Sequence, residues 1–522
     1  MDTRPIRFVH RGRIVSVDGA APTRSVLDWL REDARCTGTK EGCAEGDCGA
    51  CTVVVAELAA QGAASGSAAA QATVVGGLSL RPVNACIRFL PTLDGKALLT
   101  VEDLAAITGG SGLHPVCINE LHPVQRAMVE CHGSQCGFCT PGFVMTMTAS
   151  YEQHCEAGTV PSRAQLADEL AGNLCRCTGY RPILDAGQRM FELPKKRLDT
   201  APIVALLQQL RADPPLHYVA PNPAQPGRQD HFHAPRTLDA LATLRAQQPQ
   251  ARLLAGCTDI GLWVNKQFRD LGDILYVGEV DELKRIAVAD GQLHIGAGAP
   301  LEDAWGALAA HWPTLTEAWR RFAGPPVRHA GTMGGNVANG SPIGDSAPVL
   351  IALGTRIVLR RGAAEREMLL EDFYLDYMKN QLAEGELLTA LRVPLPAPRQ
   401  QLRAYKISKR FDCDISALFA GLAIELDGET VASARFAFGG MAAIVKRARG
   451  AEVAVTGKPW TEATVQAAMA ALDQDFTPLT DLRASADYRR QVARGLLMRL
   501  WLETRPARPL AEASVWAATA TA

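Results

Sequence analysis

The sequence predicts an α+β protein built from several domains. Its 522 residues suffice for two to four separate hydrophobic cores. Twelve of the 14 cysteines precede residue 178, whereas the later part of the chain carries glycine-rich turns between apolar segments. Residues 195–230 separate these two regions, and their many prolines are expected to break any long helix and leave the segment irregular. We therefore expect cysteine-rich domains, then a linker draped over the surface, then further domains.

Composition narrows the class of protein. The formal net charge is −1, which argues against a nucleic-acid-binding protein because such a protein needs a basic face. No apolar run approaches the roughly 18 residues that span a bilayer. The first residues lack the apolar segment of a signal peptide. We expect a cytoplasmic protein, in which crowded cysteines are more often metal ligands than disulfides.

Four cysteines have the spacing of a plant-type ferredoxin. Three lie in one loop in the pattern C-x4-C-x2-C, and the fourth follows after 34 intervening residues. This spacing is typical of a [2Fe–2S] cluster, and glycines in the loop allow backbone N–H groups to point at its sulfurs. The expected ligands are Cys43, Cys48, Cys51 and Cys86. Such a cluster transfers single electrons, so the sequence indicates an electron-transfer protein.

A second set of cysteines combines C-x2-C with C-x-C. The expected ligands are Cys136, Cys139, Cys175 and Cys177, with 35 residues between the two pairs. Thr140-Pro141 predicts the start of a helix, and this helix is expected to continue to Tyr151. Ser162 caps a second predicted helix that ends near Gly172, and Arg181-Pro182 begins a third. Helix ends would bring the two pairs together around a second [2Fe–2S] cluster.

Two other interpretations of the eight cysteines remain. Structural zinc sites usually show paired C-x2-4-C knuckles, which C-x4-C-x2-C fits poorly. Buried structural thiols do not require this spacing. His132 lies four residues before Cys136, and we expect it on a helix surface rather than as a ligand. The remaining cysteines are interpreted as core or incidental: Cys36, Cys117, Cys131, Cys155, Cys257 and Cys413.

Two glycine-rich stretches follow the linker. Residues 253–261 predict a strand, a turn and a helix, and backbone N–H groups in such a turn can hold a pyrophosphate. Residues 331–345 are too polar and glycine-rich for a core. Neither stretch matches G-x-G-x-x-G, so a Rossmann site is not supported, and a single turn of this kind is often only a turn.

The strings EGCAEGDCGACTV, NACI, GSQCGFCTPGF and NLCRCTGYRPI resemble the iron–sulfur region of the molybdenum hydroxylases, and among them the xanthine dehydrogenases. The resemblance implies a β-grasp ferredoxin-like [2Fe–2S] domain over 1–100 and a helical [2Fe–2S] domain over 101–194. It implies, after the linker, a vanillyl-alcohol-oxidase-type FAD domain over 231–399. A small α+β C-terminal flavoprotein domain over 400–505 and a tail over 506–522 complete the chain. An Ala/Gly/Ser-rich insertion, residues 59–72, departs from the family pattern and is expected to be a flexible loop.

The resemblance also implies roles for single residues. Gln135 matches the position that contacts the pterin of the molybdenum cofactor. The loop 405–415 lies near the flavin in the family, and Lys406, Lys409 and Arg410 are candidates for tuning flavin or binding nicotinamide phosphates. Phe322 and Leu388 are equally consistent with core packing. The implied FAD contacts are Leu254, Ala255, Gly256, Cys257, Thr258, Asp259, Ile260, Phe322, Gly324, Thr332, Met333, Gly334, Gly335, Asn336, Ser341, Asp345, Leu388 and Lys406.

The last 120 residues or so carry no stretch that matches a molybdopterin site of the family, so the resemblance implies a large partner chain that holds the molybdenum cofactor. The complex would be a dimer of heterodimers that oxidises hypoxanthine or xanthine to urate, with electrons passing through two [2Fe–2S] clusters and FAD to NAD+. The partner would set the substrate. One alternative is therefore the iron–sulfur/FAD subunit of an aldehyde, nicotinate or aromatic-acyl dehydrogenase. Two others are a stand-alone flavin/iron–sulfur diaphorase and a zinc protein with a degenerate flavin domain.

Overall fold

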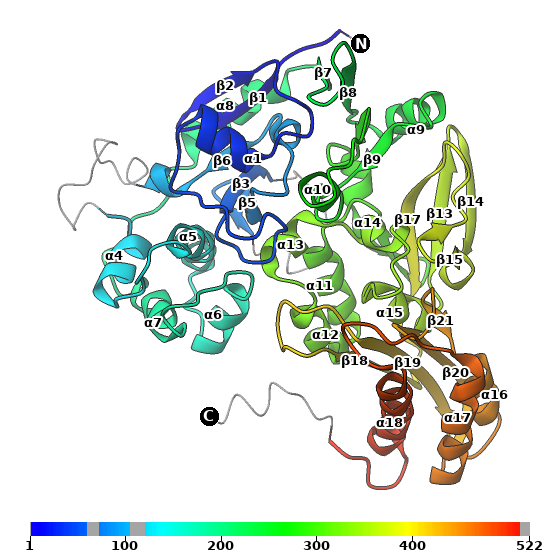
Figure 1. Cartoon of the computed structure of the whole chain (residues 1–522). Helices are drawn as coiled ribbons and strands as arrows, with labels where there is room; N and C mark the ends of the chain where they lie inside the picture. Colours follow the sequence, from blue (N-terminus) through cyan, green and yellow to red (C-terminus); the bar gives the residue numbers. More distant parts are fainter. Residues whose placement is uncertain (1, 60–72, 105–120, 512–522) are drawn as a thin grey trace.

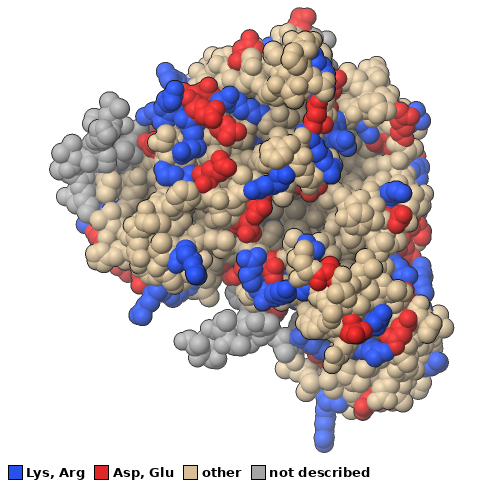
Figure 2. Space-filling model, in the orientation of Figure 1, with Lys and Arg blue, Asp and Glu red and all other residues tan. Residues whose placement is uncertain are grey.

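The computed structural model describes residues 2–59, 73–104 and 121–511. Nearly all of the expected insertion at 59–72, Cys117 and the last part of the expected tail lie outside these residues. Figure 1 shows the ferredoxin-like and helical regions on one side, the central region beside them, and the C-terminal region at the opposite end. Within the described residues, every helix is too short or too polar to cross a bilayer. Basic and acidic side chains are interspersed over the face drawn in Figure 2.

The N-terminal region is a mixed sheet with the strand order β2-β1-β6-β3-β5-β4. Strands β1 and β6 run parallel, and the other neighbours run antiparallel. One face packs on α1 and on the π-helical turn that continues it over Trp29–Asp33. The elements are β1 (Ile6–His10), β2 (Arg13–Val17), α1 (Val26–Asp28), β3 (Thr52–Leu58), β4 (Val74–Val75), β5 (Leu78–Asn84) and β6 (Ala97–Leu99).

The described part of the next region contains four helices: α4 (Pro123–Glu130), α5 (Thr140–Ala157), α6 (Arg163–Glu169) and α7 (Arg181–Arg189). The three helices predicted from the sequence correspond to α5, α6 and α7. Cys139 rather than Thr140 is the N-cap of α5, so Pro141 occupies the first turn, where its missing N–H costs nothing. Ser162 caps α6 with a capping box shared with Gln165.

The proline-rich connection differs from the irregular linker that the sequence predicted. It contains α8 (Ala201–Arg211) and β7 (Leu216–Pro221). Pro202 lies in the first turn of α8, where proline starts a helix instead of breaking it. Ile203, Leu207 and Leu210 are buried, and α8 packs against β1 and β3. The connection therefore docks the central region onto the ferredoxin-like sheet.

The central region contains two larger sheets and a two-stranded sheet formed by β15 and β16. The first has the order β7-β8-β10-β9 and the second the order β11-β12-β17-β13-β14. Figure 1 shows the helices α11 to α15 beside these sheets. The elements are β8 (Gln229–Ala234), α9 (Leu238–Gln247), β9 (Arg252–Leu254), α10 (Ile260–Asn265), β10 (Ile274–Tyr276), β11 (Ile286–Ala289), β12 (Gln292–Gly296), α11 (Leu301–His311), α12 (Thr316–Arg321), α13 (Pro325–Ala330), α14 (Met333–Ala338), α15 (Ser346–Ala352), β13 (Arg356–Arg361), β14 (Ala364–Leu369), β15 (Tyr374–Asp376), β16 (Lys379–Asn380) and β17 (Leu387–Pro394).

The C-terminal sheet is buried on both faces, and its residues alternate between two cores. In β19, Phe419 and Ala423 pack into the core of the central region, whereas Ala420 and Leu422 pack against the C-terminal helices. The elements are β18 (Gln400–Ile407), β19 (Leu418–Asp427), β20 (Thr430–Gly439), β21 (Lys446–Arg447), α16 (Arg449–Val455), α17 (Glu462–Asp475) and α18 (Ala486–Thr504). The strand and helix order agrees with the predicted small α+β domain.

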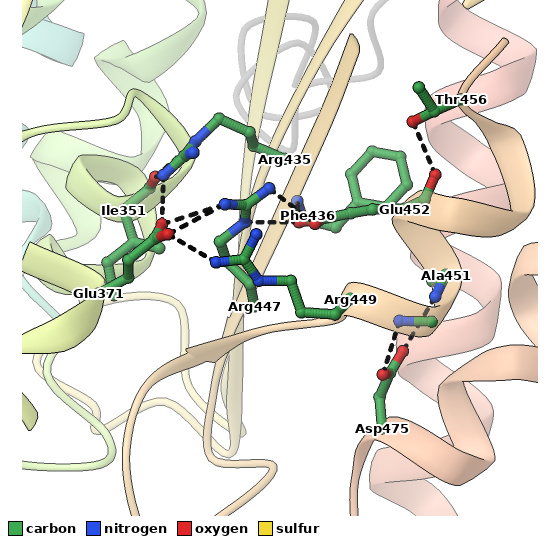
Figure 3. Close-up of polar contacts among 11 residues, drawn as sticks. Ile351, Glu371, Arg435, Phe436, Arg447, Arg449, Ala451, Glu452, Thr456 and Asp475 are labelled. Atoms are coloured by element: carbon green, nitrogen blue, oxygen red, sulfur yellow. Dashed lines mark hydrogen bonds and ion pairs between the residues drawn. The ribbon is translucent and has the colours of Figure 1, made fainter. Parts of the chain in front are cut away.

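A buried carboxylate joins the central and C-terminal regions. Glu371, in a short 3-10 helix of the central region, is 7% exposed at its side chain and faces three arginines from the C-terminal region (Figure 3). Arg447 binds it at 3.0 Å and Arg449 at 2.7 Å, and Arg435 completes the set. Arg447 also pairs with Glu452 at 2.7 Å, so two carboxylates offset three cations.

We predict that Glu371→Gln destabilises the protein by about 3 kcal/mol, because it leaves the partly buried Arg435 without its carboxylate partner and removes one of the two carboxylates that bind Arg447. Urea unfolding of the intact protein measures the change. Glu365→Gln is the matched control, since its side chain is 50% exposed and lies 4.0 Å from Arg360; that change should stay within about 0.5 kcal/mol. Equal stability of the two variants would contradict the assigned role of Glu371.

Candidate functional site

The sheet brings the first four cysteines together. Thr52 on β3 pairs with Asn84 on β5, and the N–H of Ala85 donates to the carbonyl of Cys51 at 3.2 Å. The fourth cysteine, Cys86, therefore lies beside the end of the loop that carries the other three. In that loop, the backbone N–H groups of Glu45 and Cys48 donate to the Cys43 sulfur at 3.5 and 3.4 Å.

The sulfurs of this first quartet are in direct contact. Hydrogen bonds from the Cys48 and Cys86 thiols lower the pKa of Cys43, and a hydrogen bond from Cys86 lowers the pKa of Cys51. A Cβ at Gly42 would lie 2.8 Å from the Cys48 sulfur, so glycine is required for the loop to close. Cys51 and Cys86 are buried. The quartet can supply the thiolates that metals bind.

The second quartet lies at helix ends, as predicted. Cys136 and Cys139 precede α5, while Cys175 and Cys177 lie in the turn before α7. The N–H of Phe138 and the Cys177 thiol lower the pKa of Cys136, whereas burial raises the pKa of Cys139 to about 12. The Cys136 and Cys177 side chains are exposed, so this quartet opens to the molecular surface.

Polar groups also surround Cys175. The N–H and hydroxyl of Thr178 lie 3.5 and 3.2 Å from its sulfur. The backbone N–H of Cys175 donates to the hydroxyl of Tyr180 at 3.1 Å. Tyr180 itself has a left-handed backbone, which turns the chain into α7. These contacts fix the turn that carries the last two cysteines.

Asn173 joins the two quartets. Its side-chain amide donates to the carbonyl of Gly49 at 3.0 Å, and its amide oxygen accepts from the Thr146 hydroxyl at 2.7 Å. The N–H of Leu174 donates to the carbonyl of Cys48 at 2.9 Å. Cys48 belongs to the first quartet, and Leu174 directly precedes Cys175 of the second. One backbone hydrogen bond therefore links the two sets of ligands.

A second contact joins the first quartet to the central region. The side-chain amide of Asn265, at the end of α10, donates to the carbonyl of Cys86 at 2.8 Å and to that of Ala44 at 3.1 Å. Helix α10 lies so close that a Cβ at Gly261 would be 2.5 Å from the carbonyl oxygen of Ile87. The start of the same helix, Ile260, lines a cleft.

This cleft has a volume of about 460 Å³ and is walled by the β9–α10 turn, by α14, by the start of β17 and by the segment after β12. Most of the residues predicted to contact FAD meet here. Those that line the cleft are Leu254, Ala255, Gly256, Cys257, Thr258, Asp259, Ile260, Thr332, Gly334, Gly335, Asn336 and Leu388.

Several predicted residues lie elsewhere. Lys406 is buried, with its ammonium 2.7 Å from the Asp345 carboxylate and 2.8 Å from the Ser416 hydroxyl. It therefore neutralises Asp345 inside the protein and does not reach the cleft. A Cβ at Gly324 would lie 2.6 Å from the Cα of Gly172 in the helical region. The other predicted residues absent from the cleft wall are Phe322, Met333 and Ser341.

The loop 405–415 also lies away from the cleft wall. The Cys413 thiol donates to the carbonyl of Ala171 at 3.0 Å, so the loop rests on the helical region. The Lys409 ammonium donates to the carbonyl of Leu482 at 3.0 Å. Arg410 is 61% exposed at its side chain and pairs with Asp414 at 3.7 Å. Gln135 is exposed beside Cys136.

Sequence reasoning missed other residues of the cleft. Arg252 and Trp263 line it, and the guanidinium of Arg252 lies 5.3 Å from the centre of the Trp263 ring. Both flank the predicted turn within a few residues, so a wider window would have included them. Ala297 and Gly298 also line the cleft, and the Gly-Ala run after β12 was the signal for this wall.

The described residues fit the groups that the sequence predicts. Each quartet brings four cysteine sulfurs together, linked by thiol hydrogen bonds between pairs of them, which suits a [2Fe–2S] cluster. In the cleft, a Cβ at Gly256 would lie 1.9 Å from the carbonyl oxygen of Ala330, so only glycine allows the turn to pack there. The buried amide oxygen of Asn336 lacks a hydrogen-bond partner within the described residues. It is available to a polar ligand such as FAD.

Four family models match the chain in sequence. Residues 8–87 match a 2Fe-2S iron-sulfur cluster binding domain, and residues 100–188 match a [2Fe-2S] binding domain. Residues 228–396 match the FAD binding domain in molybdopterin dehydrogenase, and residues 403–504 match the CO dehydrogenase flavoprotein C-terminal domain. Together, these matches define the chain as an iron–sulfur flavoprotein.

Known proteins extend the match over most of the chain. Xanthine dehydrogenase of Emericella nidulans is 32% identical over 95% of this chain and 38% of its own length. Xanthine dehydrogenase 1 of Arabidopsis thaliana is 29% identical over 91% of this chain and 37% of its own length. The chain thus spans little more than a third of these relatives. A carbon monoxide dehydrogenase structure from Hydrogenophaga pseudoflava covers 51% of this chain and 94% of its own, with 29% identity and a TM-score of 0.49.

The chain belongs to the molybdenum hydroxylase family, of which it carries the two iron–sulfur domains, the FAD domain and the C-terminal flavoprotein domain. The predicted fold class is confirmed at this level. The matched domains are [2Fe–2S] and FAD binding domains, and these groups transfer electrons.

We predict that Gly49→Ala weakens the contact between the two cluster regions. Gly49 has φ +69°, and a Cβ there would lie 2.3 Å from the carbonyl oxygen of Gly172. Gly158→Ala is the matched control, because its φ is +66° and nothing lies within 4 Å of the new Cβ. The control should lose only the roughly 1–2 kcal/mol of left-handed backbone strain.

Thermal unfolding and electron paramagnetic resonance of the reduced protein distinguish the two variants. Gly49→Ala should lower the melting temperature further than Gly158→Ala and should weaken the magnetic interaction between the clusters. Identical behaviour of the two variants would contradict a tight contact at Gly49.

Proposed function

We propose that this chain is the electron-transfer and NAD+-reducing small subunit of a xanthine dehydrogenase. In the complete enzyme, a molybdenum cofactor on a large partner subunit would oxidise hypoxanthine or xanthine to urate. The two [2Fe–2S] clusters supply one-electron transfer, and FAD supplies hydride transfer to NAD+. The assembly would be a dimer of heterodimers in the cytoplasm.

The observation that carries this proposal is the unbroken contact from one cofactor site to the next. The second quartet is hydrogen-bonded to the first through Leu174 and Cys48. The first quartet is hydrogen-bonded through Cys86 to Asn265, in the helix whose other end lines the cleft. If the carriers occupy these three sites as proposed, they would lie in a linear order, with the second quartet at one end and the cleft at the other.

The different exposure of the two quartets favours electron transfer from the second quartet, through the first quartet, to the cleft. Cys136 and Cys177 are exposed, and Gln135 is exposed beside them. Cys51 and Cys86 of the first quartet are buried, which excludes water and side reactions from that position. A partner that carries the molybdenum cofactor would bind over the second quartet, where Gln135 would contact the cofactor.

The residues of this chain would position the cofactors and stabilise the negative charge on them. Backbone N–H groups of Glu45, Cys48 and Thr178 point at cysteine sulfurs, and such hydrogen bonds stabilise negative charge on a cluster. Arg252 is the cationic side chain that we assign to the FAD pyrophosphate. Arg410, exposed on the loop that rests on the helical region, remains a candidate for a nicotinamide phosphate.

A sister enzyme is the second candidate. The match of residues 403–504 to the CO dehydrogenase flavoprotein C-terminal domain favours a molybdenum hydroxylase with another substrate, such as an aldehyde, nicotinate or aromatic-acyl dehydrogenase. The partner subunit would decide between these enzymes, because substrate specificity would lie there.

Purification of the native complex tests the proposal. We expect a large partner to co-purify, with one molybdenum, four iron and one FAD per heterodimer, and with xanthine-dependent reduction of NAD+. Molybdenum without xanthine activity would support the sister enzyme. Iron and FAD without a partner or molybdenum would instead support a diaphorase.

We also predict that Cys136→Ser removes one of two distinguishable paramagnetic resonance signals from the reduced protein. The iron content should fall from four to two per chain, because each cluster would depend on its own quartet. Cys131→Ser is the matched control: Cys131 is partly buried, close in sequence and outside both quartets, and should retain both signals. Loss of both signals, or of neither, in Cys136→Ser would contradict two separate clusters.

A further inference from the structure

Three histidines form a cluster on the first sheet of the central region. His217 lies on β7, while His231 and His233 lie two residues apart on β8. His217 pairs directly with His233 across the strands, so all three side chains project from the same face. Figure 1 places β7 and β8 beside the N-terminus of the chain. The cysteine quartets and the cleft wall do not include these residues.

The three imidazoles are close enough to bind one ion. Their potential ligand atoms lie within 4.8 Å of one another. Nε2 of His217 is 3.1 Å from Nδ1 of His231. The rings of His217 and His233 are stacked, with their centres 4.4 Å apart. Two ligands of a tetrahedral zinc ion with Zn–N bonds of about 2.0–2.1 Å lie about 3.3 Å apart. The first pair of nitrogens already has this separation.

His233 provides an independent indication of a ligand. It is 6% exposed, and its Nδ1 lacks a hydrogen-bond partner within the described residues. A buried nitrogen without a partner is costly, and coordination of a metal ion would satisfy it.

We propose that His217, His231 and His233 bind a divalent transition-metal ion of the zinc class. Imidazole nitrogens suit zinc, copper and nickel, and of these zinc is the occupant to which we assign the site. His217 and His231 are half-buried, which leaves the fourth coordination position to water. The hydrogen bond between His217 and His231 would be replaced by two bonds to the metal.

The position of the cluster suggests a structural role. The carbonyl of His217 accepts a hydrogen bond from the N–H of Arg4 at 3.0 Å, and the guanidinium of Arg4 pairs with Asp94 at 2.6 Å in the ferredoxin-like region. The N–H of His231 donates to the Asp273 carboxylate at 2.9 Å, beside β10. A metal that joins β7 to β8 would therefore strengthen the sheet edge on which the N-terminal segment is held.

Zinc analysis of the full protein, prepared without a polyhistidine tag, tests the proposal. The protein is incubated with zinc sulfate, separated from unbound ion, and analysed by mass spectrometry for zinc and iron. We expect one zinc per chain in addition to the iron. His217→Gln and His231→Gln should each bind zinc at least about 100-fold more weakly in competition with a chromophoric chelator. His311→Gln, a half-buried histidine outside the cluster, should bind as the unmodified protein does.

X-ray absorption at the zinc edge identifies the zinc ligands in the unmodified protein. It therefore tests the proposal even where a histidine variant fails to fold. Scattering from three imidazoles and one oxygen would support the site. Sulfur ligands would overturn it, since they would place the zinc in a cysteine quartet. Retention of no zinc by the unmodified protein, or unchanged affinity in folded His231→Gln, would also overturn it.

Discussion

The close approach of the two cysteine-bearing regions is the constraint on which the proposed electron path depends. Asn173 is buried and satisfies polar groups of both regions at once, because its amide donates to Gly49 and accepts from Thr146. The backbones come so near that a Cβ at Gly142 would lie 2.1 Å from the carbonyl oxygen of Gly49. Such an approach requires glycine on both sides. The short distance allows one hydrogen bond to link ligands of the two quartets.

The same principle recurs where the ferredoxin-like region meets the central region. Gly261 lets α10 pack on Ile87, and Asn265 binds the carbonyl of Cys86. Two ion pairs stabilise the same interface outside the α10 contact. The Lys96 ammonium lies 2.5 Å from the Glu279 carboxylate, and the Arg81 guanidinium lies 2.7 Å from the Asp303 carboxylate. Rigid elements and buried polar contacts thus position three sites that lie on loops and turns. Rigidity matters for electron transfer because it fixes the distances between carriers.

Local patterns predicted most of what is local in the structure. The cysteine spacings found both quartets, and the β9–α10 turn provided seven consecutive residues of the cleft wall. Contacts between residues far apart in the sequence could not be predicted from local patterns. Lys406 binds Asp345, 61 positions away, so two polar residues expected at the flavin satisfy each other instead. The prolines of the connection were interpreted as helix breakers, although Pro202 lies in the first turn of α8.

Anomalous diffraction at the iron absorption edge tests the central claim most directly, because it locates the metals without reference to sequence. The account predicts two pairs of iron atoms per chain, one pair within the first quartet and one within the second, with flavin electron density in the cleft beside α10. A single metal atom in each quartet, or an anomalous signal at the zinc edge in the cysteine quartets, would contradict the electron-transfer path.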